Sequence, residues 1–335
     1  MRIWVKRSLA GLLALVLAGG AAAAWKQEEL SRLASVLVLF EPDRIVGNFS
    51  HMDVMFPSVE LDRGDVPVSP LPDGPRMVLP EGAKDWIAAR TVTALLVLKD
   101  GTLVYEDYYQ GTGPEDLRVG WSVSTSWLSA LAGVLIDEGL IALDDPLDRH
   151  APMLAGSAYE GVSLRDALQM STGVAFDEDY EDFWSDINRM GRVLALGQSM
   201  DGFVGGLDAR AGPPGRWTYV STDTHAVAMA LRGAAGKPLP ELISEKLVQP
   251  LGLERAPSFV TDGHGVAFAL GGLSVTARDQ ARFAQMLLQG GRWQGRQIVP
   301  EDWLAEAMAP QAEVPPGAKG YGYQFWLPAD ARPGE

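Results

Sequence analysis

Ser122 is the residue of this sequence whose position best suits nucleophilic chemistry. It follows Gly120-Trp121 and opens a stretch, ending at Gly139, in which apolar residues recur at helical spacing. A serine at the start of a helix meets backbone N–H groups and the positive end of the helix dipole, which both favour developing negative charge. Serine is also a common N-cap, so a purely structural role is the competing interpretation.

The string Tyr219-Val220-Ser221 lies close to Trp217, and on these residues alone simple packing is the interpretation of Tyr219. No metal or cofactor is predicted, because cysteine is absent and the four histidines lack metal-ligand spacing. The acidic stretch 176–186 is predicted to be a solvated loop, with a calcium site as the alternative.

Composition narrows the class of partner. The chain has 335 residues, with 28 Lys and Arg against 43 Asp and Glu, so its formal net charge is −15. A chain this acidic repels phosphate backbones, which argues against nucleic acid as a partner. Hydrophobic residues make up 47 % and charged residues 21 %, which is ordinary for a globular protein of one or two domains. The expected partner is a small molecule.

The sequence pattern predicts a mixture of helix and sheet. Two β-rich runs flank the turn dipeptide Asp100-Gly101 and predict a hairpin. Residues 144–215 are mostly helical by pattern, which predicts a helical subdomain inserted into a sheet domain. The predicted fold class is α+β. The expected hairpin strands are 91–98 and 102–109, the further strands 268–275 and 321–327, and the further helices 222–233, 239–248 and 276–289.

The first 24 residues have the pattern of an export signal. Arg2, Lys6 and Arg7 precede an apolar run that ends in four alanines. Residues 1–24 are therefore predicted to be a signal peptide or, if retained, a membrane anchor formed by residues 8–25. Either outcome exports the protein to the periplasm or the cell exterior, with membrane attachment in the second case.

Residues 25–84 are predicted to be an N-terminal extension rather than a domain. Its first part, 27–40, reads as a short amphipathic helix. The part over 41–80 is rich in Pro, Asp and Gly, which predicts a wrapping arm. Regular structure is expected to resume near Asp85.

Five stretches, in order along the chain, resemble one enzyme superfamily. The string around Ser122 resembles the nucleophile helix of the serine β-lactamase and penicillin-binding-protein superfamily, and most of all the branch of class C β-lactamases, esterases and 6-aminohexanoate-dimer hydrolases. The resemblance covers residues 86–327 and implies a β-lactamase-like antiparallel sheet flanked by helices. It also implies an acyl-enzyme on Ser122 that cleaves an amide or ester. The stretches are 119–141, 162–173, 219–221, 236–253 and 271–279.

The resemblance implies a role for each matching residue. Ser122 is the nucleophile, Tyr219 assists it, and Ser221 contacts substrate. Tyr180 and Asp186 align with residues that line the acyl pocket in the amide-hydrolysing branch. The N–H of the serine and a backbone N–H of a late edge strand hold the oxyanion in this family.

The family's proton-accepting lysine is missing. In the family it stands three residues after the nucleophile, on the same helical face, and Thr125 occupies that position. A threonine hydroxyl relays a proton but does not hold one as a base near neutral pH. Lys99, on the predicted hairpin, is the alternative base, and Arg216 offers charge near Tyr219 but no proton-accepting site. The chain is therefore expected to be a serine hydrolase or, alternatively, a catalytically impaired homologue that binds cell-wall peptide or β-lactam-like ligands without turnover.

A second departure concerns the third motif of the family, which lies on an edge strand. It is expected after residues 321–327, and the sequence stops at Glu335. We therefore expect a truncated chain that lacks the C-terminal strands of the sheet. The hydrolase domain is placed at 85–335, with its helical subdomain at about 144–215.

The string 120–124 also resembles the nucleophile elbow of α/β-hydrolases. That fold needs a strand directly before Ser122 and a later acid and histidine, for which Asp262 and His264 are the candidates. Residues 117–120 have poor strand character, and alternating βα units are absent from the pattern. The β-lactamase-like interpretation is therefore preferred, and the histidines are expected to be structural.

Overall fold

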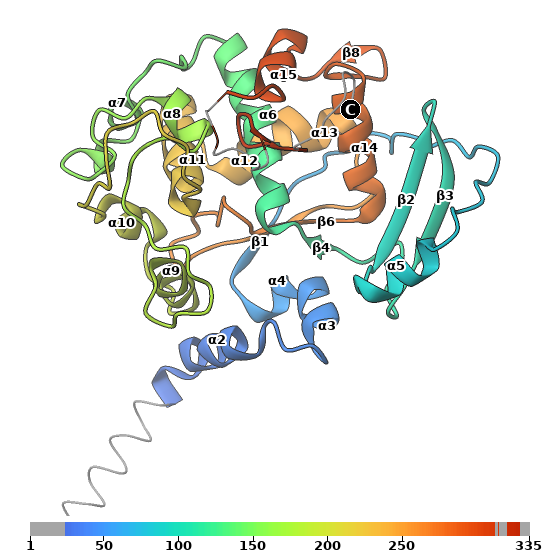
Figure 1. Ribbon diagram of the computed structural model, residues 1–335, viewed down its shortest axis with the longest axis horizontal. Helices are drawn as coiled ribbons and strands as arrows, with labels where there is room; N and C mark the ends of the chain where they lie inside the picture. The colour runs from blue at the N-terminus through green and yellow to red at the C-terminus, as the bar shows by residue number, and fades with distance from the viewer. Residues whose placement is uncertain (1–23, 312–313, 315–319, 329–335) are drawn as a thin grey trace, which may run out of the picture.

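The computed structural model describes residues 24–311, 314 and 320–328. The predicted signal peptide or anchor lies outside these described residues, apart from Ala24. None of the helices within the described ranges has the length and apolarity needed to cross a membrane. Figure 1 shows a central helix, α6 (Ser124–Asp137), with a helical region on one side and a separate hairpin on the other.

Four short antiparallel strands form the central sheet, in the order β1-β5-β6-β4. Val59 pairs with Phe259, which in turn pairs with Leu273, and Arg118 pairs with Val275. Every residue of β5 and β6 is buried, so the sheet lies inside the molecule. The strands are β1 (Ser58–Glu60), β4 (Arg118–Val119), β5 (Ser258–Val260) and β6 (Leu273–Val275).

Two predicted strands differ from the structure. The prediction of a strand over 268–275 is wrong for its first half, where the backbone turns before β6 begins. The prediction of one strand over 321–327 is also wrong, because β9 (Gly320–Tyr321) and β10 (Trp326–Leu327) form a tight hairpin. Gln324 lies in its turn with φ of 62°, a left-handed conformation that a strand does not contain.

The N-terminal arm holds more regular structure than its composition predicted. The expectation that regular structure resumes only near Asp85 is wrong. Met52 and Phe56 stand four residues apart and are both buried against the sheet. Burial of such an apolar pair can stabilise a short helix even in a Pro- and Gly-rich segment. The elements are α2 (Gln27–Val38), as predicted, followed by α3 (Ile45–Ser50), α4 (Met52–Met55), strand β1 and α5 (Ala83–Ala89).

The predicted hairpin is confirmed and forms a sheet of its own, β2 (Ala94–Lys99) with β3 (Thr102–Tyr108). The turn residues Asp100 and Gly101 have φ of 52° and 77°, as a tight hairpin turn requires. Arg278 of α14 (Ala277–Leu288) holds the hairpin through two hydrogen bonds to the Glu106 carboxylate, of 2.7 and 2.8 Å.

The remaining elements are helices around the core and one further two-stranded hairpin. The predicted helices at 222–233 and 276–289 are confirmed, and the one at 239–248 is helical throughout, with α geometry to Ile243 and π geometry from Ser244. The boundaries of the helical subdomain stay a prediction. These elements are α7 (Leu147–His150), α8 (Leu164–Leu168), α9 (Asp186–Ala195), α10 (Met200–Gly205), α11 (Ser221–Ala235), α12 (Leu239–Ile243), α13 (Gln249–Leu251), α14 (Ala277–Leu288), β7 (Arg292–Trp293), β8 (Arg296–Gln297) and α15 (Glu301–Ala307).

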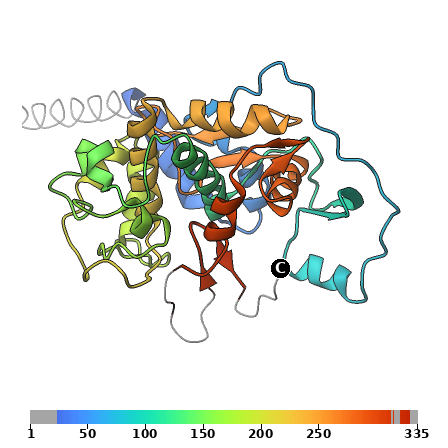
Figure 2. The ribbon, with the colours of Figure 1, turned by 90° about the horizontal axis from the view of Figure 1, so that it is seen from above.

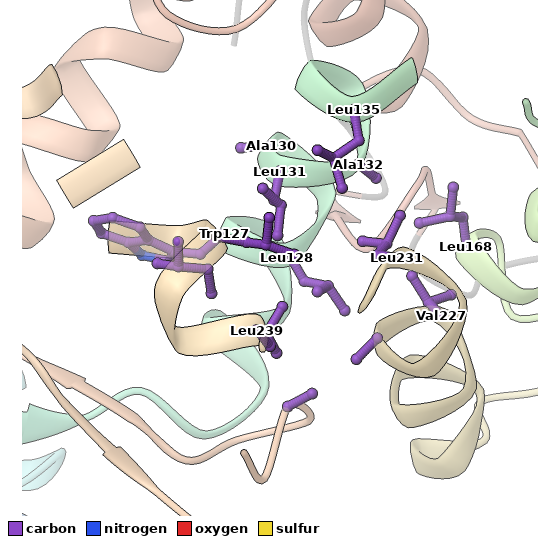
Figure 3. Close-up of a cluster of buried hydrophobic side chains, with 14 of the residues drawn as sticks. Trp127, Leu128, Ala130, Leu131, Ala132, Leu135, Leu168, Val227, Leu231 and Leu239 are labelled. Carbon is purple, nitrogen blue, oxygen red and sulfur yellow. The ribbon is translucent and has the colours of Figure 1, made fainter. Parts of the chain in front are cut away.

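Helix α6 is the centre of the hydrophobic core. Every residue from 127 to 135 is buried, which is possible only for a helix covered on all sides. Figure 3 shows its leucines meeting Val227 and Leu231 of α11. Figure 2 shows the red C-terminal elements beside α6, where Ser126 donates to the Gln324 carbonyl at 3.0 Å. Packing therefore fixes the N-terminal end of α6, and Ser122 directly before it.

We predict that Gly133→Ala destabilises the protein, because a Cβ there would lie 2.2 Å from the buried Trp303 ring of α15. The expected loss is ~1–3 kcal/mol of unfolding free energy, the usual result of overpacking a core. Urea unfolding followed by circular dichroism measures it. The control is Gly191→Ala in α9, where a Cβ meets no atom within 4 Å. That change should be neutral or gain ~0.5–1 kcal/mol from helix propensity, and equal stability of the two variants would contradict the prediction.

Candidate active site

Ser122 and Tyr219 lie 97 residues apart in sequence and meet in space. The Tyr219 hydroxyl donates a hydrogen bond to Ser122 Oγ at 3.0 Å. Ser122 sits in the 3-10 turn that precedes α6, and Tyr219 stands two residues before α11. Both side chains are half-buried. The packing of α6 on α11 therefore holds the two hydroxyls at hydrogen-bond distance.

Trp121 gives the chain before the nucleophile an unusual shape. Its φ is 43°, a left-handed value that a bulky residue rarely adopts. The indole stacks on Phe40, with ring centroids 5.5 Å apart, and packs edge-on against Phe49 at 5.6 Å. The close approach of the Gly271 backbone fixes it from the other side, since a Cβ at Gly271 would lie 3.2 Å from Trp121. Aromatic contacts from the N-terminal arm therefore stabilise the conformation that presents Ser122.

Thr125, in the position of the family lysine, faces the backbone. Its buried hydroxyl donates to the Ser122 carbonyl at 2.8 Å and lies 3.5 Å from the Gln324 carbonyl. A hydroxyl that donates its proton to a carbonyl helps to shape the turn. Among the described residues, the Thr125 hydroxyl makes no hydrogen bond to the hydroxyl of Ser122 or Tyr219.

Glu178 is a site residue that the sequence analysis did not single out. Its carboxylate accepts hydrogen bonds from the Ser221 N–H and from the Ser221 hydroxyl, the latter at 3.1 Å. Burial raises the pKa of Glu178, against the lowering effect of those two hydrogen bonds. A single glutamate in an acidic loop gives no sequence signal that would separate it from its solvated neighbours.

The phenol of Tyr219 is held in its neutral form. Burial raises its pKa; hydrogen bonding with Ser122 and Ser221 lowers it, the Glu178 carboxylate raises it, and the net direction is upward. A neutral phenol at physiological pH can both donate and accept a proton but is a poor base on its own. Arg216 is exposed and is not among the groups that shift this pKa.

A pocket of about 280 Å³ opens beside Ser122. Ser221 and Tyr180, two of the predicted substrate-binding residues, line it together with the nucleophile. The third, Asp186, does not: its carboxylate pairs with Arg189 at 3.0 Å and accepts from the Asp177 N–H. Lys99 ends strand β2 at an exposed position away from this pocket, and no lysine is among the described residues that line it.

The residues of the alternative elbow interpretation do not meet Ser122. Strand β4 does precede the nucleophile, which corrects the expectation of poor strand character there. Asp262, however, accepts hydrogen bonds from the backbone of Met200, His264 and Val266, and neither it nor His264 lines the Ser122 pocket. The structure therefore brings no acid–histidine pair from this interpretation to the serine.

Carboxylates of the acidic loop and the buried His225 bond to other groups of the protein. Carboxylates of the loop cap its own backbone N–H groups, as Asp179 does for Glu181 and Asp182. His225 is buried and pairs with Asp201 at 2.9 Å. Within the part of the chain that the structure describes, no group of three or more His, Asp and Glu residues could hold a metal ion.

The chain belongs to the beta-lactamase family, since the family profile of that name matches residues 85–333. A 6-aminohexanoate-dimer hydrolase from Paenarthrobacter ureafaciens is 33 % identical over 223 residues. That match covers 64 % of this chain and 57 % of the relative. The chain thus spans less than two thirds of the length of that curated relative.

Solved structures agree on the fold. A Bacillus anthracis protein named as a 6-aminohexanoate-dimer hydrolase superposes with a TM-score of 0.77 at 23 % identity, over 88 % of this chain and 82 % of its own. An octameric penicillin-binding-protein homologue from Pyrococcus abyssi gives 0.55 at 21 % identity, over 73 % and 63 %. At these identities the likeness establishes the fold. The α+β, β-lactamase-like prediction and the resemblance to this superfamily are confirmed.

The raised pKa of Glu178 predicts a pH-dependent stability. The folded protein binds this proton more tightly than the unfolded chain, so the stabilisation is present below the ordinary pKa of 4.5 and is lost as pH rises through the folded value. Relative to Glu178→Gln, the wild type should therefore lose unfolding free energy as the pH rises above the ordinary pKa of 4.5.

Urea unfolding at a series of pH values makes this comparison. The matched control is Glu181→Gln, which removes the same charge from an exposed position of the same loop. Its stability should follow the wild type across the series. Identical profiles for Glu178→Gln and the wild type would show that Glu178 does not titrate with a raised pKa.

Proposed function

We propose that this protein is a serine hydrolase that cleaves an amide or ester bond through an acyl-enzyme on Ser122. The observation that carries the proposal is the 3.0 Å hydrogen bond between Tyr219 and Ser122 at the edge of a pocket. A nucleophile before a helix N-terminus, with a hydroxyl partner, suits attack on a carbonyl. The Paenarthrobacter relative is named as a hydrolase of a 6-aminohexanoate dimer, and a dimer of an amino acid joined through its amino and carboxyl groups is an amide, which supports amides as one substrate class.

Tyr219 acts in this proposal as a proton relay. The two hydroxyls first exchange donor and acceptor roles by rotation of their O–H bonds. Ser122 Oγ then attacks the substrate carbonyl carbon while its proton passes to the Tyr219 oxygen, and the phenol proton passes to the departing nitrogen or oxygen. The carbonyl-to-leaving-group bond breaks, and an ester on Ser122 remains. Water then attacks this ester, and the same relay returns a proton to Ser122. The phenol gains one proton as it gives up another, so this role does not require a tyrosinate.

The alternative is an impaired homologue that binds cell-wall peptide or β-lactam-like ligands without turnover. The observation that favours it is Thr125, whose hydroxyl is committed to the Ser122 carbonyl and supplies no base. Losing general-base assistance costs on the order of 10²–10⁴ in rate. A hydrolase releases product repeatedly, whereas a binder acylates once at most, so turnover separates the two.

We propose that the protein acts outside the cytoplasm. The basic start and apolar run of residues 1–24 support export, either as a cleaved signal peptide or as a retained anchor. The net charge of −15 supports a small-molecule substrate over a nucleic acid.

We expect Ser122 to be labelled by a fluorophosphonate and to hydrolyse p-nitrophenyl esters with turnover. Intact-mass measurement should show one added phosphonyl group on the wild type and none on Ser122→Ala. The control is Ser124→Ala, two residues after Ser122 in sequence, which removes a hydroxyl that donates to the Leu273 carbonyl. Labelling of Ser122→Ala, or failure of folded wild type to react, would reject the nucleophile. Labelling without turnover would support the impaired homologue.

The proposed relay predicts that substitutions at Tyr219 and at Thr125 change the rate in opposite directions. Tyr219→Phe keeps the ring packing but removes the hydroxyl, so ester hydrolysis should fall on the order of 10²–10⁴. Thr125→Lys restores a basic group beside the nucleophile and should raise the rate, whereas Thr125→Met, with similar bulk and no charge, should not. Steady-state kcat/KM decides this. An unchanged rate in Tyr219→Phe would remove Tyr219 from the mechanism, and an unchanged rate in folded Thr125→Lys would show that the missing base does not limit turnover.

A further inference from the structure

The pocket beside Ser122 is built by two parts of the chain. One wall comes from the hydrolase region, where Met190 and Leu194 of α9 share a buried cluster with Val260 of β5 and with Phe268. The other wall comes from the N-terminal arm, through side chains of α2 and α4 and the residues that follow them. The arm residues that line the pocket are Val36, Leu39, Phe40, Met52 and Phe56.

The arm is anchored where it meets the pocket. Arg32 of α2 donates to the Ala195 carbonyl at the end of α9, at 2.8 Å. Arg118 of β4 donates to the Val46 carbonyl and to Ser50 Oγ, both at 2.6 Å. These bonds join the arm to the helix and the strand that flank the pocket. The arm precedes residue 85, where the match to the beta-lactamase family begins, so this wall lies outside the part of the chain that the family profile matches.

The described lining carries no charged side chain. Its polar members besides the nucleophile include Ser221, Asn188 and Tyr180. The Asn188 amide is occupied by the carbonyls of Tyr180 and Asp182, at 3.1 and 2.8 Å. The Ser221 hydroxyl is occupied by Glu178. An ammonium or carboxylate at the far end of a substrate would therefore lose its hydration and find no ionic partner in this lining.

We propose that this pocket selects a neutral, unbranched aliphatic acyl group, and that the N-terminal arm determines this specificity. The inference rests on the proposed acyl-enzyme at Ser122. The acyl half of the substrate stays attached to Ser122 after the first step, whereas the leaving group must diffuse away, so the apolar pocket suits the acyl half. Its 280 Å³ lies just below the ~300 Å³ at which ligand pockets usually begin, which fits a short chain rather than a large ring system.

Two kinetic comparisons test the substrate class with a constant leaving group. Along the p-nitrophenyl esters of acetate, butanoate and hexanoate, kcat/KM should rise about fourfold per methylene, on the order of 10²-fold in total. The hexanoyl ester should exceed the 6-aminohexanoyl ester, which differs by one terminal ammonium, by at least ~10²-fold. A flat series, or equal rates for the two six-carbon esters, would overturn the inference.

Gly191→Leu tests the pocket itself. Gly191 lines the pocket from α9, and a side chain there begins in open space, so the added isobutyl group should occupy the pocket without straining the helix. The variant should lose the preference for hexanoyl over acetyl, measured as the ratio of the two kcat/KM values. The control is Gly47→Leu in α3, which also meets no atom within 4 Å and is not in the pocket lining.

The part played by the arm is tested with Met52→Asp, which places a carboxylate in that wall. Its hexanoyl rate should fall, and its 6-aminohexanoyl rate should rise because the ammonium gains a partner. Met52→Leu is the conservative variant and should resemble the wild type. Should Met52→Asp unfold, Phe40→Ala gives the same test from a more exposed position, through a reduced ratio of hexanoyl to acetyl rates. An unchanged ratio would exclude the arm as the determinant.

A binding measurement separates this inference from the proposed function. Calorimetric titration of the wild type with 1-hexanol and with 6-amino-1-hexanol requires no turnover. We expect binding of the neutral alcohol only, and loss of that binding in Gly191→Leu. If Ser122 neither reacts nor turns over but the alcohol binds in this way, the proposed function fails and the apolar specificity stands. If Ser122-dependent hydrolysis occurs but neither alcohol nor chain length is distinguished, the specificity fails and the hydrolase stands.

Discussion

The hydrogen bond from Tyr219 to Ser122 is the interaction that the rest of the structure must hold in place, because the two short segments it joins have little rigidity of their own. Ser122 lies in a single 3-10 turn, and Tyr219 lies in an extended stretch before α11. What keeps the two oxygens 3.0 Å apart is the burial of the helices that follow them. Helices α6 and α11 share the core of Figure 3, so a shift of one against the other would have to open close-packed contacts.

The absence of the lysine changes the electrostatics around this hydrogen bond. A lysine at position 125 would lower the pKa of a neighbouring phenol. Here burial and the carboxylate of Glu178 both raise the pKa of Tyr219, which is the opposite direction. The site therefore favours a tyrosine that stays protonated. Such a phenol acts by exchanging protons between two partners, and its usefulness depends on distance and orientation more than on basicity.

The sequence was sufficient to predict the parts of the site that lie at helix starts. Ser122 stands just before a long apolar helix whose periodicity is visible in one sequence, and Tyr219 and Ser221, at the start of α11, were predicted from the resemblance to the family. Glu178 was not predictable, because its function depends on meeting Ser221 across 43 positions of chain. The β9–β10 hairpin was missed for a similar reason: the left-handed turn at Gln324 depends on tertiary contacts with α8 and α11.

The N-terminal arm shows why composition misled in another place. Its Pro, Gly and Asp content is typical of a loop. Apolar side chains of α2 and α4 are nevertheless buried at the pocket of the hydrolase region, and not in a core of the arm's own. Phe40 stacks on Trp121 and also lines the pocket, so the residue that supports the backbone before Ser122 also contacts the space for substrate. A ligand that displaces Phe40 would therefore disturb the conformation of Trp121, whose φ of 43° needs that support. Binding in this pocket and the position of the nucleophile are thereby coupled through one pair of stacked rings.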